Sequence, residues 1–398
     1  MKKLMMLSAI ASVALVSCVN DDSAFVGEGV KVTFDSPLLY SNVNSKANVF
    51  GEIGNHQYSQ GGTVYSYPRE ENFVIFAVSH DGNFDGWANA TPAAFNNTAI
   101  SWDNSVDGWA PKTSTGGYYY WKHGKKMSFA ACSPAELDQP NWGGADNRTY
   151  GPEGLTITDF EVASDATKQY DLLFSTRCVN QTADNMAQGA ANYSGIPIKF
   201  QHAFSSIRFS IANSSPETVV LTGITLNGVK YKGTFAENIT EDENDKSLYD
   251  VTPTTGNVQP AWTVDPALIA NPYVAFTGNI QFLENPRYVS DLVGEVGTST
   301  DIVHQLLLMP QELTNAASVT VQYTVNGSPN SKTVQIAGLE TVNPANGEGQ
   351  GTVVTEWEMG KRYTYRLYYS SETADKDKIY FAPSTDGWKD VDVIVVPL

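Results

Sequence analysis

The stretch Val319-Thr-Val-Gln-Tyr-Thr-Val-Asn-Gly327 alternates apolar and polar residues and then reaches a turn signal. Alternation with a period of two predicts a half-buried β-strand with its apolar side chains on one face: Val319, Val321, Tyr323 and Val325. Asn-Gly is a strong signal for a tight hairpin, because both residues tolerate a positive φ. The stretch therefore predicts a hairpin whose return strand ends near Val334 and Ile336.

Short strands of this kind recur along the 398 residues, which are rich in Tyr, Thr, Val, Phe, Gly and Asn. Alternation in residues 363–369 puts three tyrosines and a leucine on one face of another strand, and residues 118–132 predict a second hairpin. Many short strands separated by turn signals predict an all-β sandwich protein. The polar stretch 181–195 predicts a linker between an N-terminal sandwich at 47–190 and a C-terminal sandwich at 191–398.

The N-terminus predicts a lipoprotein precursor. Lys2 and Lys3 precede an uncharged run, residues 4–17, that is too short to span a membrane and is typical of a secretory signal. The run ends in Leu-Val-Ser-Cys18, a lipobox, so residues 1–17 are expected to be removed and Cys18 to be acylated. Two or three acyl chains give stable anchoring. Asp21 and Asp22 follow closely and resemble a signal for export to the outer surface of the outer membrane.

The charge balance argues against nucleic acid as a partner. The formal net charge is −18, and it becomes −20 when Lys2 and Lys3 leave with the signal peptide. Binding to phosphates requires clustered Lys and Arg.

Apart from Cys18, the only cysteines in the sequence are Cys132 and Cys178. They predict either one disulfide in an oxidising compartment or two buried thiols.

Four segments carry a resemblance to a known family. They are Ser128-Phe-Ala-Ala-Cys-Ser-Pro134, Phe200-Gln-His-Ala203, Leu306-Leu-Leu-Met-Pro-Gln311 and Trp357-Glu-Met-Gly-Lys-Arg-Tyr-Thr-Tyr365. In order and spacing, the chain resembles the Bacteroidales fimbrillin family, the subunits of type V pili. The resemblance implies two tandem transthyretin-like β-sandwiches and other pilin subunits as partners, in a homo- or heteropolymer that supports adhesion.

The resemblance also implies a mechanism of assembly. A trypsin-like protease cuts near the mature N-terminus, the first strand leaves, and a strand of another subunit fills the groove. Residues 18–46 are then a propeptide whose removable strand has Val30, Val32 and Phe34 pointing inward. The basic residue is Lys46, where the family usually has Arg, so the released chain would begin at Ala47. Val391, Val393 and Val395 form either the donated strand or the last strand of their own domain.

Other motifs weigh against catalysis and against a cofactor. The five histidines lack zinc spacing, and His202 is expected to be a packed, hydrogen-bonded residue. Asp81-Gly-Asn-Phe-Asp-Gly86 resembles the start of a calcium loop but has Pro92 at its twelfth position, which favours a turn. No metal site, cofactor or catalytic residue is predicted.

The alternative to a stalk, tip or anchor subunit is a surface lipoprotein that does not polymerise and binds a glycan or host ligand. A glycosidase is the least favoured hypothesis.

Overall fold

The structure is a computed structural model. It describes residues 30–35, 37–39, 52–53, 56–57, 67, 69, 71–84, 93–121, 124–135, 147–164, 169–175, 177–183, 195–238, 260–265, 272–283, 287–288, 305–340, 353–370, 389–390 and 394–397. The regular elements of these residues are β-strands, as predicted. Within the same residues, no helix has the length and apolar character needed to cross a membrane.

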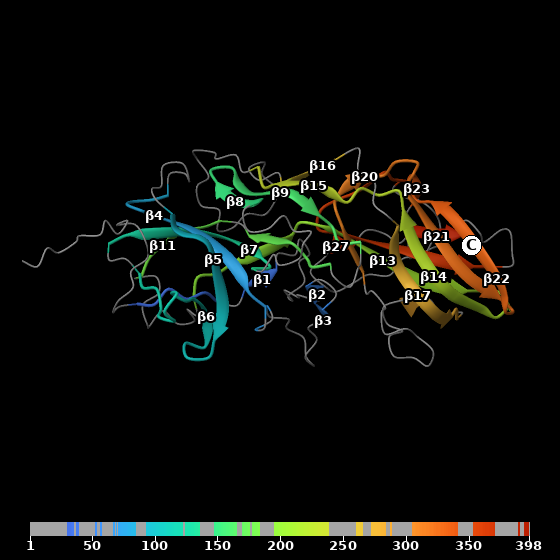
Figure 1. Ribbon diagram of the computed structural model, residues 1–398, viewed down its shortest axis with the longest axis horizontal. Coiled ribbons are helices and arrows are strands. Elements are labelled where there is room, and N and C mark those ends of the chain that lie inside the picture. Colours follow the sequence, from blue (N-terminus) through green and yellow to red (C-terminus); the bar gives the residue numbers. More distant parts are fainter. Residues whose placement is uncertain are drawn as a thin grey trace, which may run out of the picture.

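Two sheets lie toward one end of the molecule (Figure 1). The first has eight strands in the order β1-β12-β10-β7-β4-β5-β6, and β11 also pairs with β7. Their bounds are β1 Leu38–Leu39, β12 Lys199–His202, β10 Leu173–Ser175, β7 Lys126–Ser133, β4 Phe73–His80, β5 Ala93–Asp103, β6 Gly108–Pro111 and β11 Cys178–Gln181. The second sheet has the order β16-β15-β9-β8. Its strands are β16 Ala261–Val264, β15 Lys232–Ala236, β9 Gly154–Glu161 and β8 Arg148–Gly151.

Two further sheets contain most of the C-terminal strands. One has the order β18-β13-β26-β27, with β19 beside β13 and β28 beside β26. Its strands are β18 Arg287–Tyr288, β13 Ser205–Asn213, β26 Lys361–Tyr369, β27 Lys389–Asp390, β19 Leu306–Leu308 and β28 Ile394–Pro397. The other has the order β17-β14-β21-β22. Its strands are β17 Tyr273–Gln281, β14 Val219–Asn227, β21 Ser318–Val325 and β22 Ser328–Gln335.

Three small two-stranded pairs complete the described strands. They are β2 Glu52–Ile53 with β3 His56–Gln57, β20 Gln311–Glu312 with β25 Glu356–Trp357, and β23 Leu339–Glu340 with β24 Val353–Val354.

The hairpin predicted from the Asn-Gly turn is confirmed. Strands β21 and β22 pair antiparallel along their whole length. Asn326 and Gly327 adopt φ values of 49° and 82°, which a tight turn of this hand requires. Three of the four predicted core side chains are buried and the last is half-buried: Val319, Val321, Tyr323 and then Val325.

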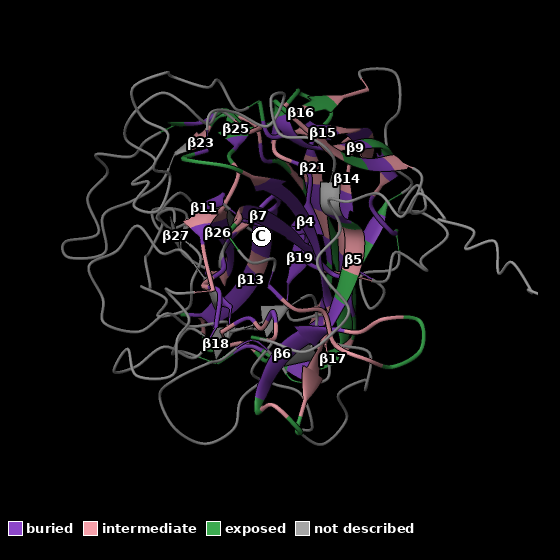
Figure 2. Cartoon of the chain, turned by 90° about the vertical axis from the view of Figure 1, so that its left-hand side faces the viewer, coloured by how far each residue is buried: buried purple, intermediate pink, exposed green. Residues whose placement is uncertain are grey.

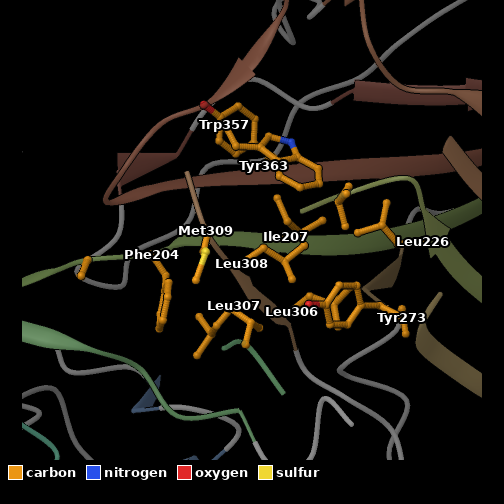
Figure 3. Packing of buried hydrophobic residues seen from close by; sticks show 14 of the residues in the cluster. Phe204, Ile207, Leu226, Tyr273, Leu306, Leu307, Leu308, Met309, Trp357 and Tyr363 are labelled. Atoms are coloured by element: carbon orange, nitrogen blue, oxygen red, sulfur yellow. The ribbon is translucent and has the colours of Figure 1, made fainter. Parts of the chain in front are cut away.

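The buried face of β21 packs against the sheet of β13 and β26. Ile207 and Tyr363 lie side by side in a parallel pairing and point into this core. Figure 3 shows them together with residues 306–309 and Trp357. The stacked rings of Phe204 and Trp262, with centroids 5.4 Å apart, continue the same core toward β9 and β15.

The eight-stranded sheet is buried on both of its faces. Val74, Phe76 and Val78 of β4 belong to the core shared with β9 and β15. Phe73, Ile75 and Ala77 alternate with them and belong to a second apolar cluster on the opposite face. This explains why the sequence of β4 is apolar at successive positions and not alternating. Figure 2 shows β4 and β7 as buried strands in the interior.

The hairpin predicted at residues 118–132 is wrong. Strand β7, which covers its second half, pairs with β4, β10 and β11. Tyr118 instead bridges Lys112, and Tyr120 bridges Lys31. The physical reason is that β7 is buried on both faces, which suits the centre of a sheet and not one arm of a surface hairpin.

Strands from both sides of residue 190 share sheets. Strand β9 pairs with β15, and β10 pairs with β12. The sheets of the described residues are thus not divided at 190/191. The two predicted units, 47–190 and 191–398, stay a prediction.

A buried carboxyl group lies where β9 and β15 meet. Glu237 is 1% exposed and accepts a hydrogen bond from the backbone N–H of Leu155 at 2.8 Å. A Cβ atom on Gly154 would overlap this side chain, so the glycine makes room for it. Burial raises the pKa of Glu237 from 4.5 to about 7, although the Leu155 N–H and the charge of Arg177 act in the opposite direction.

We expect Glu237 to make the folded state less stable as the pH rises. Its pKa is higher in the folded than in the unfolded chain, so folding takes up a proton between about pH 4.5 and 7. Its stabilising contribution is complete below that window and is lost as the pH rises through it. The free energy of unfolding should therefore fall between pH 5 and pH 8, and Glu237→Gln should reduce this fall by about 2 kcal/mol. Urea unfolding at both pH values measures this.

The matched control is Glu153→Gln, an exposed carboxyl on the neighbouring turn. It should keep the pH slope of the unchanged chain. Equal slopes for Glu237→Gln and the unchanged chain would contradict the assignment.

Candidate functional site

The N-terminal segment Val30–Asp35 runs between two other parts of the chain. On one side, Val32 donates to the Tyr119 carbonyl at 2.9 Å, and Trp121 donates to the Val30 carbonyl at 2.8 Å. These bonds place the segment antiparallel to residues 118–121. Backbone groups along one edge of the segment are thus paired as in a sheet.

The other end of the segment is bonded on both edges. Phe34 donates to the Trp109 carbonyl at 2.7 Å and accepts from the Trp109 N–H at 3.3 Å. Ile196 donates to the Thr33 carbonyl at 2.9 Å and accepts from the Asp35 N–H at 3.0 Å. The segment is therefore an inserted strand at this end, antiparallel to one neighbour and parallel to the other.

Two side chains of the segment are fully buried. Val32 and Phe34 are each 0% exposed and belong to the second apolar cluster. The Phe34 ring meets Phe73 and Phe129 edge to face, with centroids 6.0 and 5.5 Å apart. Val30 was predicted to point inward, but it is 43% exposed because it lies at the open end of the segment.

A glycine makes the close approach of this strand possible. Gly195 has a φ of 149°, and a Cβ atom there would overlap the backbone of Phe34 and Asp35. Any larger residue would push the strand away from Ile196. Beyond the segment, β1 continues the attachment by pairing parallel with β12.

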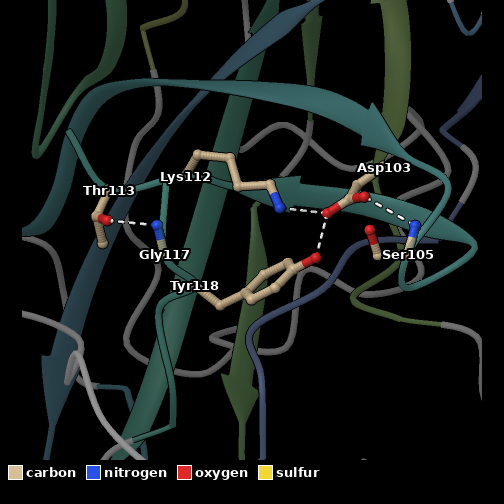
Figure 4. Close-up of polar contacts among 6 residues, drawn as sticks. All are labelled: Asp103, Ser105, Lys112, Thr113, Gly117 and Tyr118. Carbon is tan, nitrogen blue, oxygen red and sulfur yellow. Dashed lines mark hydrogen bonds and ion pairs between the residues drawn. The ribbon is translucent and has the colours of Figure 1, made fainter. Parts of the chain in front are cut away.

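A polar cluster flanks the start of the segment (Figure 4). Asp103 at the end of β5 accepts hydrogen bonds from the Lys112 ammonium and the Tyr118 hydroxyl, and from the Ser105 N–H at 2.8 Å. The Lys112 hydrogen bond, followed by that of Tyr118, holds the pKa of Asp103 well below its usual range. The ammonium of Lys31 lies 3.9 Å from the centroid of the Tyr118 ring, and that of Lys112 lies 3.6 Å from it.

Sequence reasoning found the strand but missed this cluster. Lys31 and Tyr118 are far apart in the chain, and neither has a motif around it. The only signal was the position of Lys31 between two apolar residues, which marks it as pointing to the other side of the strand.

Most of the remaining predicted site residues cannot be compared with the structure. Cys18, Lys46, Ala47, Val391 and Val393 lie outside the described residues. Val395 lies in β28, opposite Arg366 of the neighbouring β26.

The two cysteines are free and buried. Cys178 lies opposite Phe129 in the pairing of β11 with β7, and both belong to the second apolar cluster. Cys132 is three residues along β7 from Phe129 and belongs to the cluster on the opposite face. Two thiols on opposite faces of one sheet fit the alternative of two buried thiols and not a disulfide.

The residues weighed for metal or base chemistry have structural partners. His202 is buried and pairs through Nδ1 with Asp171. Asp81 accepts from Lys125 at 2.7 Å, and Asn83 accepts from Lys126 at 2.8 Å, while Asp85 lies outside the described part. Across the described segments, no group of three or more His, Cys, Asp or Glu could hold a metal ion.

Tryptophan side chains could stack on sugar rings if they were exposed, but those that the structure describes in residues 93–121 lie mainly inside. Trp109 and Trp121 are buried. Trp102 is half-buried, with the guanidinium of Arg69 3.8 Å from its ring centroid. Trp87 and Trp142 lie outside the described residues.

Comparison with known proteins identifies one family. Residues 67–383 match the sequence model of a family described as fimbrillin-like. No curated protein matches the chain.

Several solved structures show low similarity. A proposed cell adhesion protein from Bacteroides uniformis has 10% identity and a TM-score of 0.39, with 86% of this chain and 93% of that chain covered. One from Bacteroides ovatus has 12% identity and a TM-score of 0.40, with the same coverage. The fimbrial anchor protein Mfa2 from Porphyromonas gingivalis has 12% identity and a TM-score of 0.24, covering 76% and 81%. The assignment therefore rests on the sequence match.

We expect Phe34→Ala to destabilise the folded chain by about 3–5 kcal/mol, because it empties a fully buried aromatic site. Urea unfolding followed by tryptophan fluorescence measures the loss. Thr33→Ala, at the half-buried neighbouring position, is the control and should cost much less. Equal effects of the two substitutions would show that the segment does not complete the core.

Proposed function

The chain belongs to the fimbrillin-like family, and on that premise we propose that it is a structural subunit of a cell-surface pilus that assembles by exchange of its N-terminal strand. In this proposal, residues 30–35 occupy the groove until a protease releases them. A strand of another subunit then takes their place by the same main-chain hydrogen bonds.

The observation that supports this most is the insertion of the segment between its two neighbours. It is hydrogen-bonded to Trp109 and to Ile196 and buries Val32 and Phe34 completely. Its removal would expose an apolar groove and unpaired backbone groups on both sides. Such a groove is unstable in water and binds an extended strand with alternating apolar side chains.

Anchoring and release are the two ends of the proposed pathway. Cys18 would carry the lipid that holds the precursor in the outer membrane. Cleavage after Lys46 would then give a subunit that begins at Ala47 and has lost the lipid and the strand together. An anchor subunit would keep both.

The partner in this pathway is another pilin, in a homo- or heteropolymer. A strand at the C-terminus, with Val391, Val393 and Val395, is the candidate for donation. Strand β28 pairs with β26 at the edge of its sheet, so donation would require it to leave that edge. Stalk, tip and anchor roles are distinguished by which of these two strands moves.

The function is tested by cutting the folded full chain with a lysine-specific protease. We expect a product that begins at Ala47, followed by oligomers that resist detergent and separate on heating, because the opened groove captures strands. Gel electrophoresis with N-terminal sequencing of each band measures both steps. Lys46→Gln is the control and should give neither.

The same sequencing applies to protein sheared from the native cell surface. A lipidated Cys18 on every molecule would contradict a stalk role. A cut chain that stays monomeric would contradict strand exchange and favour a lipoprotein that binds a ligand without polymerising.

A further inference from the structure

We propose that the groove selects an incoming strand by a basic residue at the position of Lys31, and that the chain's own C-terminal strand does not meet this requirement. The inference rests on the proposed strand exchange and adds to it the chemistry of the partner. The partner is a strand of another subunit with a Lys or Arg next to two buried apolar positions.

The first support is the cation site formed by Tyr118. The Lys31 ammonium lies 3.9 Å from the ring centroid, within the range of a cation–π interaction. The Tyr118 hydroxyl donates to the ionised Asp103 carboxylate, which increases the negative character of the ring. The Lys112 ammonium already lies 3.6 Å from the centroid of the same ring and pairs with Asp103, so Lys31 is the second cation at a ring that is held in place by the groove.

The second support is the register. Lys31 bridges Tyr120, and the bonds of Val30 and Val32 to Trp121 and Tyr119 fix the strand on either side of it. The residue at this position must lie beside the Tyr118 ring whenever these bonds form. Charge at this point and apolar side chains at 32 and 34 are thus recognised together.

The third support is the sequence of the C-terminal strand. Aligning Val391, Val393 and Val395 with Val30, Val32 and Phe34 puts Asp392 in the place of Lys31. An acid there would lose the cation–π contact and lie beside the negative face of the ring, while the charge of Asp103 is balanced by Lys112. Such a strand lacks the cation–π contact that the native strand makes.

Other registers do not restore the match. Lys389 is the one basic residue in the sequence 388–398. Placing it at the position of Lys31 puts Asp390 and Asp392 in the fully buried positions of Val32 and Phe34. A buried unpaired carboxylate costs far more than a cation–π contact provides. No register of this segment gives a cation over Tyr118 and apolar residues in both buried positions.

The test uses the full chain cut after Lys46 in the folded state, with labelled peptides of residues 28–39 as competitors. Fluorescence anisotropy measures their entry into the groove. The native peptide and Lys31→Arg should bind equally. Lys31→Met should bind about two- to fivefold more weakly, the fold-change that corresponds to an exposed cation–π contact. Lys31→Glu and a peptide of residues 387–398 should also bind more weakly than the native peptide.

Two controls separate charge recognition from a general effect. A Thr33→Glu peptide carries an acid on the same side of the strand, away from Tyr118, and should lose less affinity than Lys31→Glu. Tyr118→Leu in the protein should bring the native and Lys31→Met peptides to the same affinity. Binding of Lys31→Glu as tight as that of the native peptide, or tighter binding of the 387–398 peptide, would overturn the proposal.

A second measurement tests the selectivity at Lys31 without relying on strand exchange. If no peptide enters the groove, exchange itself fails, and unfolding of the uncut chain decides the selectivity. Lys31→Glu should then lower the urea midpoint more than Thr33→Glu, and the difference should vanish in the Tyr118→Leu background. Equal midpoints for the two variants would overturn the selectivity.

Discussion

The burial of Phe34 in the second face of the eight-stranded sheet is the constraint on which the N-terminal end of the structure depends. That face carries the apolar side chains of β4 and β7, and the described residues cover it partly with the segment that holds Val32 and Phe34. Its opposite face is closed by β9 and β15. A sheet apolar on both sides needs two covers, and here one of the covers comes from the N-terminal end of the chain.

The C-terminal sheets depend on a different arrangement. Strand β26 lies parallel between β13 and β28, while the other sheet is built from hairpins and antiparallel neighbours. The mixed sheet brings segments that are far apart in sequence into adjacent positions. Its core face is formed by Ile207, Tyr363 and their neighbours, which explains the alternation of tyrosines that the sequence shows at 363–369.

Local patterns predicted the parts of the fold that depend on local physics. The Asn326-Gly327 turn and the alternation before it fix a hairpin, because the turn geometry is set by two residues. The pairing of β7 could not be predicted from its neighbours in sequence, since an apolar run can pair with any strand that needs a central partner. The same limit applies to the site. Val32 and Phe34 follow from alternation, whereas the contact of Lys31 with Tyr118 depends on how two remote segments come together.

Phe34 is bonded to Trp109 on one edge and Asp35 to Ile196 on the other. These bonds affect the rate at which the segment can dissociate as well as its stability. A strand paired on a single edge can separate one bond at a time, with water replacing each lost partner. Here, the loss of one edge leaves the other intact, and Gly195 keeps the backbones too close for water to enter between them. Spontaneous departure then needs several bonds to break in one event, which makes the barrier high and the dissociation slow. The time for which the segment stays in place is therefore set by kinetics, and it can be far longer than the equilibrium stability alone would suggest.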